Sequence, residues 1–291
     1  MTQELAFDSK QAEAVEPIRE YEIRGGGGIT LRAREWGNPD GRAILFVHGW
    51  SQCDLCWVAQ VSGPLAARFR MVTFDNRGHG TSEKPLDPSC YADGRLWADD
   101  VAAVIDGTGL ERPVVVAWSY GGFIVADYVR AHGDSGIAGI DLVGAAVRLR
   151  PPSFDHLGPG LLDRATDVCA PDLGTSIPAV QRFLRSCTAR ELDEMLWSRA
   201  LCWNMVVPPE VRLALISREI ENEDVLAGLS VPVLVTHGTE DAIVLPSMAE
   251  HTLEHCKTAS VSWYEGVGHM PFIESAQRFD RELAAFAERA V

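Results

Sequence analysis

Short apolar runs alternate with helical patterns along most of this 291-residue chain, and the alternation limits the folds open to it. A buried strand followed by a helix and another strand forms a crossover connection, so repeated units give a mostly parallel sheet with helices on both faces. The expected strands of these units are residues 43–47, 71–74, 113–117, 137–143, 232–236 and 259–263, and the expected helices are residues 94–106, 123–131, 246–255 and 275–289.

Two more strands are expected before these units, at residues 21–24 and 29–36. They are joined by four consecutive glycines, residues 25–28, and glycine adopts the positive φ values that a tight hairpin needs. The sheet would then hold eight strands. Residues 1–18 show no clear periodicity and are expected to form a loose arm.

The alternation stops between about residues 148 and 228. No convincing strand is found there, but there are helical stretches, proline-rich connections and bulky side chains, namely Phe183, Met195, Trp197, Trp203 and Met205. A helical insertion within an α/β domain indicates a cap or lid. We therefore predict a core formed by residues 1–147 and 229–291, with a helical cap at residues 148–228 inserted after the sixth strand.

The formal net charge of -15 disfavours a nucleic-acid partner, which requires a basic face, and it also disfavours an anionic membrane surface. No apolar stretch reaches about 18 residues, so no transmembrane span is expected. The polar, acidic start of the chain lacks the basic and apolar regions of a secretory signal, and a cytoplasmic location is the expectation. The sequence favours a small-molecule partner and does not fix an oligomeric state.

The seven cysteines are an odd number scattered along the chain, which is not the pattern of a disulfide framework. Cys53 and Cys56 form a lone C-x-x-C motif, and no second pair of cysteines or histidines completes a zinc site with it. We therefore expect no metal and no cofactor.

A valine-rich strand runs straight into Ser119, and a helix is expected directly after it. This arrangement resembles the nucleophile elbow, G-x-S-x-G, in which a strained strand-to-helix turn exposes the serine hydroxyl above the sheet. The positions two residues before and after the serine must be small, and here they are Ala117 and Gly121. Taken alone, the pattern also fits a serine that caps the following helix.

Three further segments, in the expected order, resemble the α/β-hydrolase family. The first is the end of a strand at His48-Gly49-Trp50, where the family has a loop that supplies one backbone N–H of the oxyanion hole. The residue after the nucleophile supplies the other N–H, so the donors carried over by position are Trp50 and Tyr120. His48 and His237 lie at strand ends, and we interpret both as structural.

The other two segments carry an acid and a histidine. A strand ends in Gly238, and Asp241 follows where the family's triad aspartate lies, with Glu240 as the competing acid. His269 lies in a glycine-lined loop after the last strand, which gives the chain order serine, acid, histidine. The resemblance thus implies Ser119 as nucleophile, His269 as general base and Asp241 as the acid that orients it.

One more segment matches the family without carrying the reaction. Residues 75–82 follow the pattern D-x-R-G-x-G-x-S, which is common in the family after this strand. We expect Asp75 and Arg77 to brace loops below the site through hydrogen bonds.

The resemblance implies a serine hydrolase that cleaves a carboxylic ester or lactone through an acyl-enzyme intermediate. C–C bond hydrolases and cofactor-free haloperoxidases or perhydrolases stay open as alternatives, as does a non-catalytic ligand receptor on the same fold. The bulky Trp50 and Tyr120 beside the serine predict small acyl groups. With Trp197 and Trp203 of the cap, they are the predicted substrate-binding residues.

Overall fold

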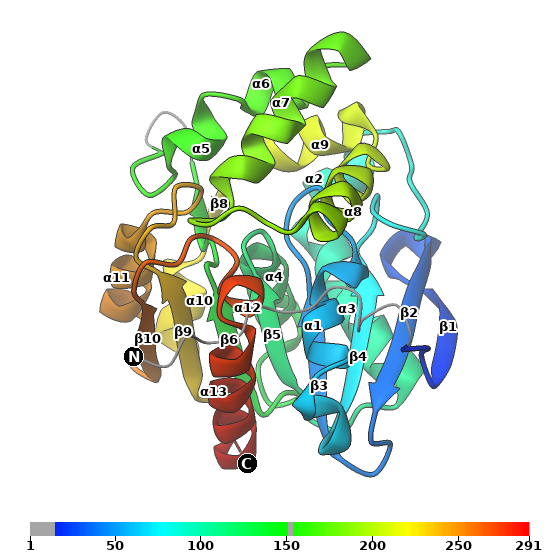
Figure 1. Ribbon diagram of the computed structural model, residues 1–291. Helices are drawn as coiled ribbons and strands as arrows, with labels where there is room; N and C mark the ends of the chain where they lie inside the picture. The colour runs from blue at the N-terminus through cyan, green and yellow to red at the C-terminus, as the bar shows by residue number, and fades with distance from the viewer. Residues whose placement is uncertain (1–14, 151–153, 291) are drawn as a thin grey trace.

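The computed structural model describes residues 15–150 and 154–290, and its centre is one eight-stranded sheet (Figure 1). The strand order is β1-β2-β4-β3-β5-β6-β9-β10, with β2 antiparallel to both neighbours and all other pairs parallel. This is the mostly parallel sheet that the alternation predicts. Its strands are β1 (Arg19–Arg24), β2 (Thr30–Gly37), β3 (Arg42–Val47), β4 (Phe69–Asp75), β5 (Val114–Trp118), β6 (Gly139–Val143), β9 (Val233–Gly238) and β10 (Ala259–Tyr264).

Helices cover both faces of the sheet, as a series of parallel crossovers requires. In Figure 1, α1, α12 and α13 lie in front of the sheet, and α3 and α4 lie behind it. The helical segments of this core are η2 (Gly26–Gly28), η3 (Asp54–Trp57), α1 (Val58–Val61), η4 (Pro64–Ala67), α2 (Ser89–Ala92), α3 (Gly94–Thr108), α4 (Gly121–His132), α11 (Pro246–His255), α12 (Pro271–Glu274) and α13 (Ala276–Arg289).

A helical insertion follows β6 and lies over one end of the sheet (Figure 1). A short antiparallel ribbon of β7 (Arg148–Leu149) and β8 (Ile220–Glu221) forms part of it, although no strand was expected in this region. Two-residue strands are too short for periodicity to reveal. The exact domain limits stay a prediction. The helices are α5 (Pro159–Leu162), α6 (Ala165–Val168), α7 (Leu173–Ser186), α8 (Glu194–Met205), α9 (Pro209–Ile216) and α10 (Glu223–Gly228).

The glycine run joins β1 and β2 as expected. Gly27 and Gly28 have φ values of 69° and 81°, which only glycine adopts without strain. Ile18 continues the pairing of these strands, because its N–H donates to the carbonyl of Glu35 at 2.8 Å. Most of the predicted arm, residues 1–14, lies outside the described residues.

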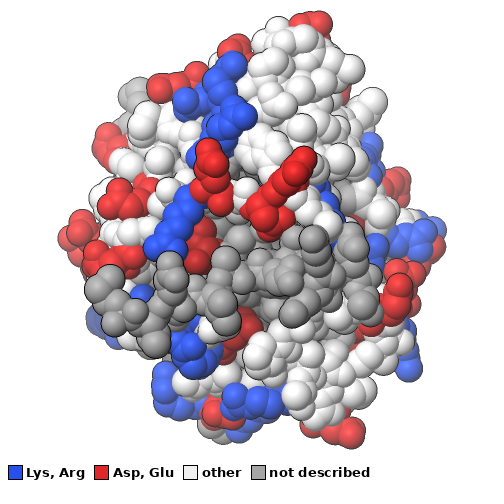
Figure 2. Space-filling model, viewed as in Figure 1, with Lys and Arg blue, Asp and Glu red and all other residues white. Residues whose placement is uncertain are grey.

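The surface carries charges of both signs. Figure 2 shows Lys and Arg side chains interspersed with Asp and Glu over the described part of one face. Within residues 15–150 and 154–290, no helix is long and apolar enough to cross a membrane.

A carboxyl group is buried in the core at β6. Asp141 is 1% exposed, and its Oδ1 accepts a hydrogen bond of 2.8 Å from Thr236 Oγ1 on β9. Its Oδ2 has no hydrogen-bond partner among the described residues. Burial raises the pKa of Asp141 to about 7, because the charged form loses its hydration.

Asp141→Asn is expected to reduce the pH dependence of the free energy of unfolding. Between about pH 4 and pH 7 the folded chain keeps a proton on Asp141 that the unfolded chain releases. Wild-type stability therefore falls by about 1.4 kcal/mol per pH unit over this range from this group, and the contribution is flat above it. The free energy of unfolding of the variant, relative to that of wild type, should therefore grow as the pH rises from about 4 to about 7. Urea unfolding at several pH values measures it, and a constant difference would contradict a buried neutral carboxyl.

Candidate active site

Ser119 occupies a strained turn between β5 and α4. Its φ is 55°, a left-handed value that costs a residue with a side chain about 1–2 kcal/mol. Backbone hydrogen bonds hold it there: its N–H donates to Val143 at 3.0 Å, and its carbonyl accepts from Gly122 at 3.0 Å and Ala146 at 3.1 Å. Helix α4 has Tyr120 at its N-cap and no side-chain cap, so Ser119 does not cap the helix.

Small residues are required around this turn because other backbone segments pass very close. A Cβ on Gly121 would lie 2.7 Å from the carbonyl oxygen of Val47, and one on Gly49 would lie 2.9 Å from Ser119 Cβ. Real Cβ contacts are not this short. The loop after β3 is therefore pressed against the serine, and this brings the backbone of Trp50 next to it.

His269 and Asp241 form a buried pair, 2% and 3% exposed. His269 Nδ1 and Asp241 Oδ2 are 2.7 Å apart, while Asp241 Oδ1 accepts from the backbone N–H groups of Ile243 and Val244 at 2.9 and 3.0 Å. The carboxylate is thus fixed on both oxygens. Glu240, the competing acid in the sequence, is exposed.

The backbone of His269 is held as well. Its N–H donates to the carbonyl of Cys187 at 2.9 Å, and its carbonyl accepts from Trp118 Nε1 at 2.9 Å. The Trp118 ring also packs against the imidazole, with ring centroids 5.5 Å apart. The loop of His269 is therefore fastened both to β5 and to the insertion.

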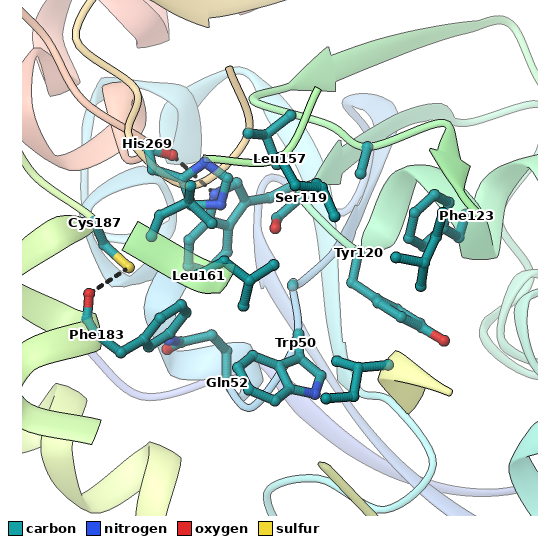
Figure 3. Close-up of a pocket in the computed structure, with 17 residues that line it drawn as sticks. Trp50, Gln52, Ser119, Tyr120, Phe123, Leu157, Leu161, Phe183, Cys187 and His269 are labelled. Atoms are coloured by element: carbon teal, nitrogen blue, oxygen red, sulfur yellow. Dashed lines mark hydrogen bonds between the residues drawn. The ribbon is translucent and has the colours of Figure 1, made fainter. Parts of the chain in front are cut away.

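Ser119 and His269 line one small, mostly apolar cavity of about 50 Å³ (Figure 3). In Figure 3 the Ser119 hydroxyl points into the cavity, with the His269 ring to one side. The core supplies Gly49, Trp50, Gln52, Trp118, Ser119, Tyr120, Phe123, Ala146, Ile243, Val244 and His269, and the helical insertion supplies Leu149, Leu157, Leu161, Phe183, Cys187 and Ile216.

Several of these lining residues carry no signal in the sequence. Leu157, Leu161, Phe183 and Cys187 come from the insertion, whose placement over Ser119 a local pattern does not reveal. Gln52 was missed too, although it follows the His48-Gly49-Trp50 motif closely. It is 2% exposed, and its Oε1 has no hydrogen-bond partner among the described residues, so it is a polar group in an apolar wall.

The two predicted oxyanion-hole residues lie at the cavity, and their side chains are hydrogen-bonded to the same helix of the insertion. Trp50 Nε1 donates to the carbonyl of Arg212 at 3.1 Å, and Tyr120 Oη donates to the carbonyl of Leu215 at 3.2 Å. Both acceptors belong to α9. No acceptor for the backbone N–H of Trp50 or Tyr120 is found in the described part of the chain.

A buried ion pair reinforces the connection at Tyr120. Arg218, which follows α9, donates to Tyr120 Oη at 3.3 Å and pairs with Asp127 of α4 at 2.7 Å. The side chains of Arg218 and Asp127 are 6% and 8% exposed. Insertion and core are thus joined by charge as well as by packing.

Arg218→Gln is expected to lower the free energy of unfolding by about 3 kcal/mol, because it leaves Asp127 buried without its partner. The matched control is Arg130→Gln on the same helix as Asp127. Arg130 pairs with Asp224 on the surface, with side chains 45% and 68% exposed, and such pairs contribute less than about 1 kcal/mol. Urea unfolding measures both variants, and equal losses would contradict the argument.

Trp197 and Trp203, two of the predicted substrate-binding residues, are not among the described residues that line the cavity. Trp203 lines a separate surface hollow with Trp36 and Leu55, and Trp197 packs under the guanidinium of Arg185 at 5.0 Å. Bulky residues on a helix show that it packs against something, but not which of its sides faces a pocket.

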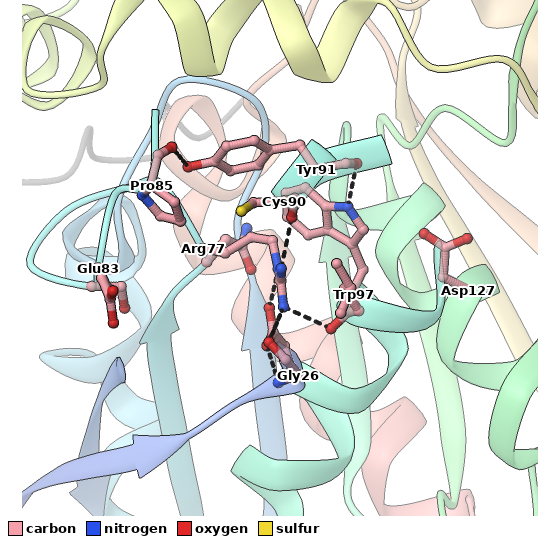
Figure 4. Close-up of polar contacts among 12 residues, drawn as sticks. Gly26, Arg77, Glu83, Pro85, Cys90, Tyr91, Trp97 and Asp127 are labelled. Carbon is pink, nitrogen blue, oxygen red and sulfur yellow. Dashed lines mark hydrogen bonds and ion pairs between the residues drawn. The ribbon is translucent and has the colours of Figure 1, made fainter. Parts of the chain in front are cut away.

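The segment after β4 braces loops, as expected. Arg77 donates to both carboxylate oxygens of Asp100, at 2.7 and 2.8 Å, and also to carbonyls that include Gly26 and Leu96 (Figure 4). Asp75 accepts from the N–H of Asp54 at 2.9 Å. These bonds fasten the glycine hairpin and α3 to the end of β4.

His48 is structural. Its Nε2 accepts the N–H of Asn76 at 3.0 Å, which leaves Nδ1 to donate to the carbonyl of Gly49 at 2.8 Å. Burial lowers its pKa, so it stays neutral. It therefore links the loops after β3 and β4.

The C-x-x-C motif lies in the interior. Cys53 and Cys56 are free thiols, and burial raises the pKa of both, which makes them poor nucleophiles. The nearby carboxylate of Asp54 is occupied by Arg34, whose Nη1 lies 2.6 and 2.7 Å from its two oxygens. We assign this motif to the core.

The strained serine turn, the paired acid and histidine, and the helical insertion after β6 define a protein of the α/β-hydrolase class. The chain belongs to this family, because the protein-family sequence profile described as "Alpha/beta hydrolase family" matches residues 44–282.

Its relatives include esterases and haloperoxidases. The crystal structure of the esterase RhEst1 from Rhodococcus sp. ECU1013 is 32% identical, with a TM-score of 0.88 over 94% of this chain and 99% of that chain. The bifunctional esterase/perhydrolase DCH of Acinetobacter calcoaceticus is 28% identical over 89% of this chain and 96% of its own length. A non-heme haloperoxidase of Rhodococcus erythropolis is 26% identical over 90% of this chain and 97% of its own length.

Proposed function

We propose that this protein is a carboxylic ester hydrolase with Ser119 as its nucleophile. The observation that carries the proposal is that Ser119, on its strained turn, lines the same cavity as a His269 held by Asp241 at 2.7 Å. His269 takes the proton of the Ser119 hydroxyl as the oxygen attacks the ester carbonyl. Asp241 fixes the ring tautomer and stabilises the imidazolium.

The backbone N–H groups of Trp50 and Tyr120 stabilise the negative charge that develops on the carbonyl oxygen. Both are at the cavity, and both lack an acceptor among the described residues, which leaves them available to a substrate. Each such donor is typically worth about 3 kcal/mol in the transition state.

Collapse of the tetrahedral intermediate breaks the ester bond. The His269 imidazolium gives its proton to the leaving alcohol, and the acyl group stays on Ser119 Oγ. A water molecule then attacks the acyl-enzyme, with His269 again as base, and releases the acid and free serine. A lactone follows the same steps, but its alcohol stays tethered to the acid.

Perhydrolysis is the second candidate, favoured by the relatives that carry this activity or haloperoxidase in their names. Hydrogen peroxide would replace water in the second step and release a peracid. The acyl-enzyme is common to both reactions, so the two differ only in the acceptor. Peracid formation from acetate ester and peroxide, measured beside hydrolysis, separates them.

The test of the proposed function is the time course of p-nitrophenyl acetate hydrolysis by the pure protein. Sustained release of nitrophenol over many turnovers is expected. A single turnover that stops at one equivalent would instead support the ligand-receptor alternative. No release at all from acetate or butyrate esters would count against ester hydrolysis.

A preference for short acyl chains is expected, because about 50 Å³ holds only a few water-sized groups beside Ser119. Overfilling such a packed cavity costs about 1–3 kcal/mol, so kcat/KM should be roughly tenfold or more lower for p-nitrophenyl octanoate than for butyrate. The insertion, which we propose acts as a cap, supplies Phe183 and Leu161 to this wall. A higher kcat/KM for octanoate than for acetate or butyrate would contradict the prediction.

A further inference from the structure

We propose that α11 carries a second site, which binds a divalent transition-metal ion such as Zn²⁺ through His251, Glu254 and His255. One ligand atom from each of these side chains lies within 4.8 Å of the other two. Their spacing, i, i+3 and i+4, places them next to one another on the helix surface. None of the three lines the cavity of Ser119, so this site is separate from the proposed active site.

Each of the two histidines already has the partner that a metal-binding imidazole usually has on its other nitrogen. His251 Nε2 is 3.1 Å from Glu223 Oε1, and His255 Nδ1 is 2.9 Å from the carbonyl oxygen of His251. Because both partners are acceptors, these nitrogens carry the protons. In the neutral tautomers that these bonds select, the lone pair of His251 is on Nδ1 and that of His255 is on Nε2, and a metal ion binds at a lone pair.

The surroundings add donors of the same kind. The ring of His156, from the insertion, lies 5.0 Å from that of His251, and the rings of His251 and His255 are 4.3 Å apart. Imidazoles packed this closely would repel one another if protonated, whereas a shared cation uses their lone pairs. Arg148 pairs with Glu223 at 3.4 Å, and no ion pair between Arg148 and the three ligands is found among the described residues.

The donor set decides the class of ion. Two imidazole nitrogens with one carboxylate oxygen match Zn²⁺ and similar borderline ions rather than Ca²⁺ or Mg²⁺, which prefer oxygen ligands. His156 would supply a further nitrogen through Nε2, since its Nδ1 lies 3.0 Å from Ser247 Oγ, and the ion would then join the insertion to α11.

The test is calorimetric titration of untagged, chelator-treated protein with ZnCl₂. We expect one ion per chain with a Kd at or below about 10 µM. His251→Ala and His255→Ala should each weaken binding at least about tenfold. The matched control is His132→Ala, because His132 pairs with Asp99 on another part of the surface and should bind as wild type.

Zn²⁺ should also raise the Tm of wild type and not that of the His251→Ala/His255→Ala double variant. Should the double variant fail to fold, Glu254→Gln changes only an exposed side chain, and weaker Zn²⁺ binding is expected from it. The proposal is overturned by wild-type binding no tighter than that of the histidine variants, by an equal loss in His132→Ala, or by unchanged binding in Glu254→Gln.

Discussion

Replacing Ser119 by alanine is expected to lower kcat/KM for p-nitrophenyl butyrate by at least about 10⁴-fold. The hydroxyl is the proposed site of the covalent bond to the acyl group. Among the described residues that line the cavity, Cys187 is a poor substitute, because it is buried and its thiol pKa is raised. The alanine leaves the strained turn and the backbone N–H groups intact. The residual rate should therefore come from substrate binding and the proposed oxyanion hole.

The control for this variant is Ser217→Ala, prepared in the same way. Ser217 is exposed, and among the described residues its hydroxyl donates to the carbonyl of Leu213 in α9, so wild-type activity is expected. Mass spectrometry after reaction with a fluorophosphonate should find the label on Ser119. Full activity in Ser119→Ala would assign the chemistry to another residue or to a contaminant.

Asp241→Asn is expected to lower kcat by about 10³- to 10⁴-fold while leaving KM nearly unchanged. The asparagine has a similar shape, but its amide presents a donor or a weak acceptor to His269 Nδ1. The tautomer with its proton on Nδ1, which leaves Nε2 free to act as the proposed base, is then disfavoured. Oδ1 would still accept from the N–H groups of Ile243 and Val244, so the loop should stay in place.

Glu240→Gln is the matched control, since Glu240 precedes Asp241 and was the competing acid. It is exposed, so its neutralisation should change kcat less than about twofold. Steady-state kinetics of both variants, with unfolding curves to show that each folds, decide between the acids. A large loss in Glu240→Gln with little in Asp241→Asn would reverse the assignment.

Most of the core could be predicted from the sequence because its signals are local. The apolar runs at β5 and β9 are buried on both faces and show as continuous valine and leucine, and Gly121 and Gly268 stand where there is no room for a side chain. Short motifs at strand ends suffice to place these residues, since parallel strands end at one edge of the sheet.

The role of the insertion was harder to predict, because it depends on contacts between residues that are distant in the sequence. The pattern of bulky residues indicated helices, but not that Phe183 faces Ser119 while Trp203 faces a hollow elsewhere. These two residues lie on different helices, α7 and α8, and which neighbour each side chain meets depends on how its helix docks. Gln52 and the histidines of α11 were missed for a related reason, since each gains meaning only from residues distant in sequence.

The attachment of Trp50 and Tyr120 to α9 has a consequence for heat inactivation. The two residues proposed to supply the oxyanion hole belong to the sheet edge, yet their side chains are fastened to a segment that is separate from the sheet. Local unfolding of that segment releases both at once, although β3 and β5 keep their pairing. Activity should therefore follow the melting of the least stable cooperative unit that includes α9, and not the melting of the whole molecule.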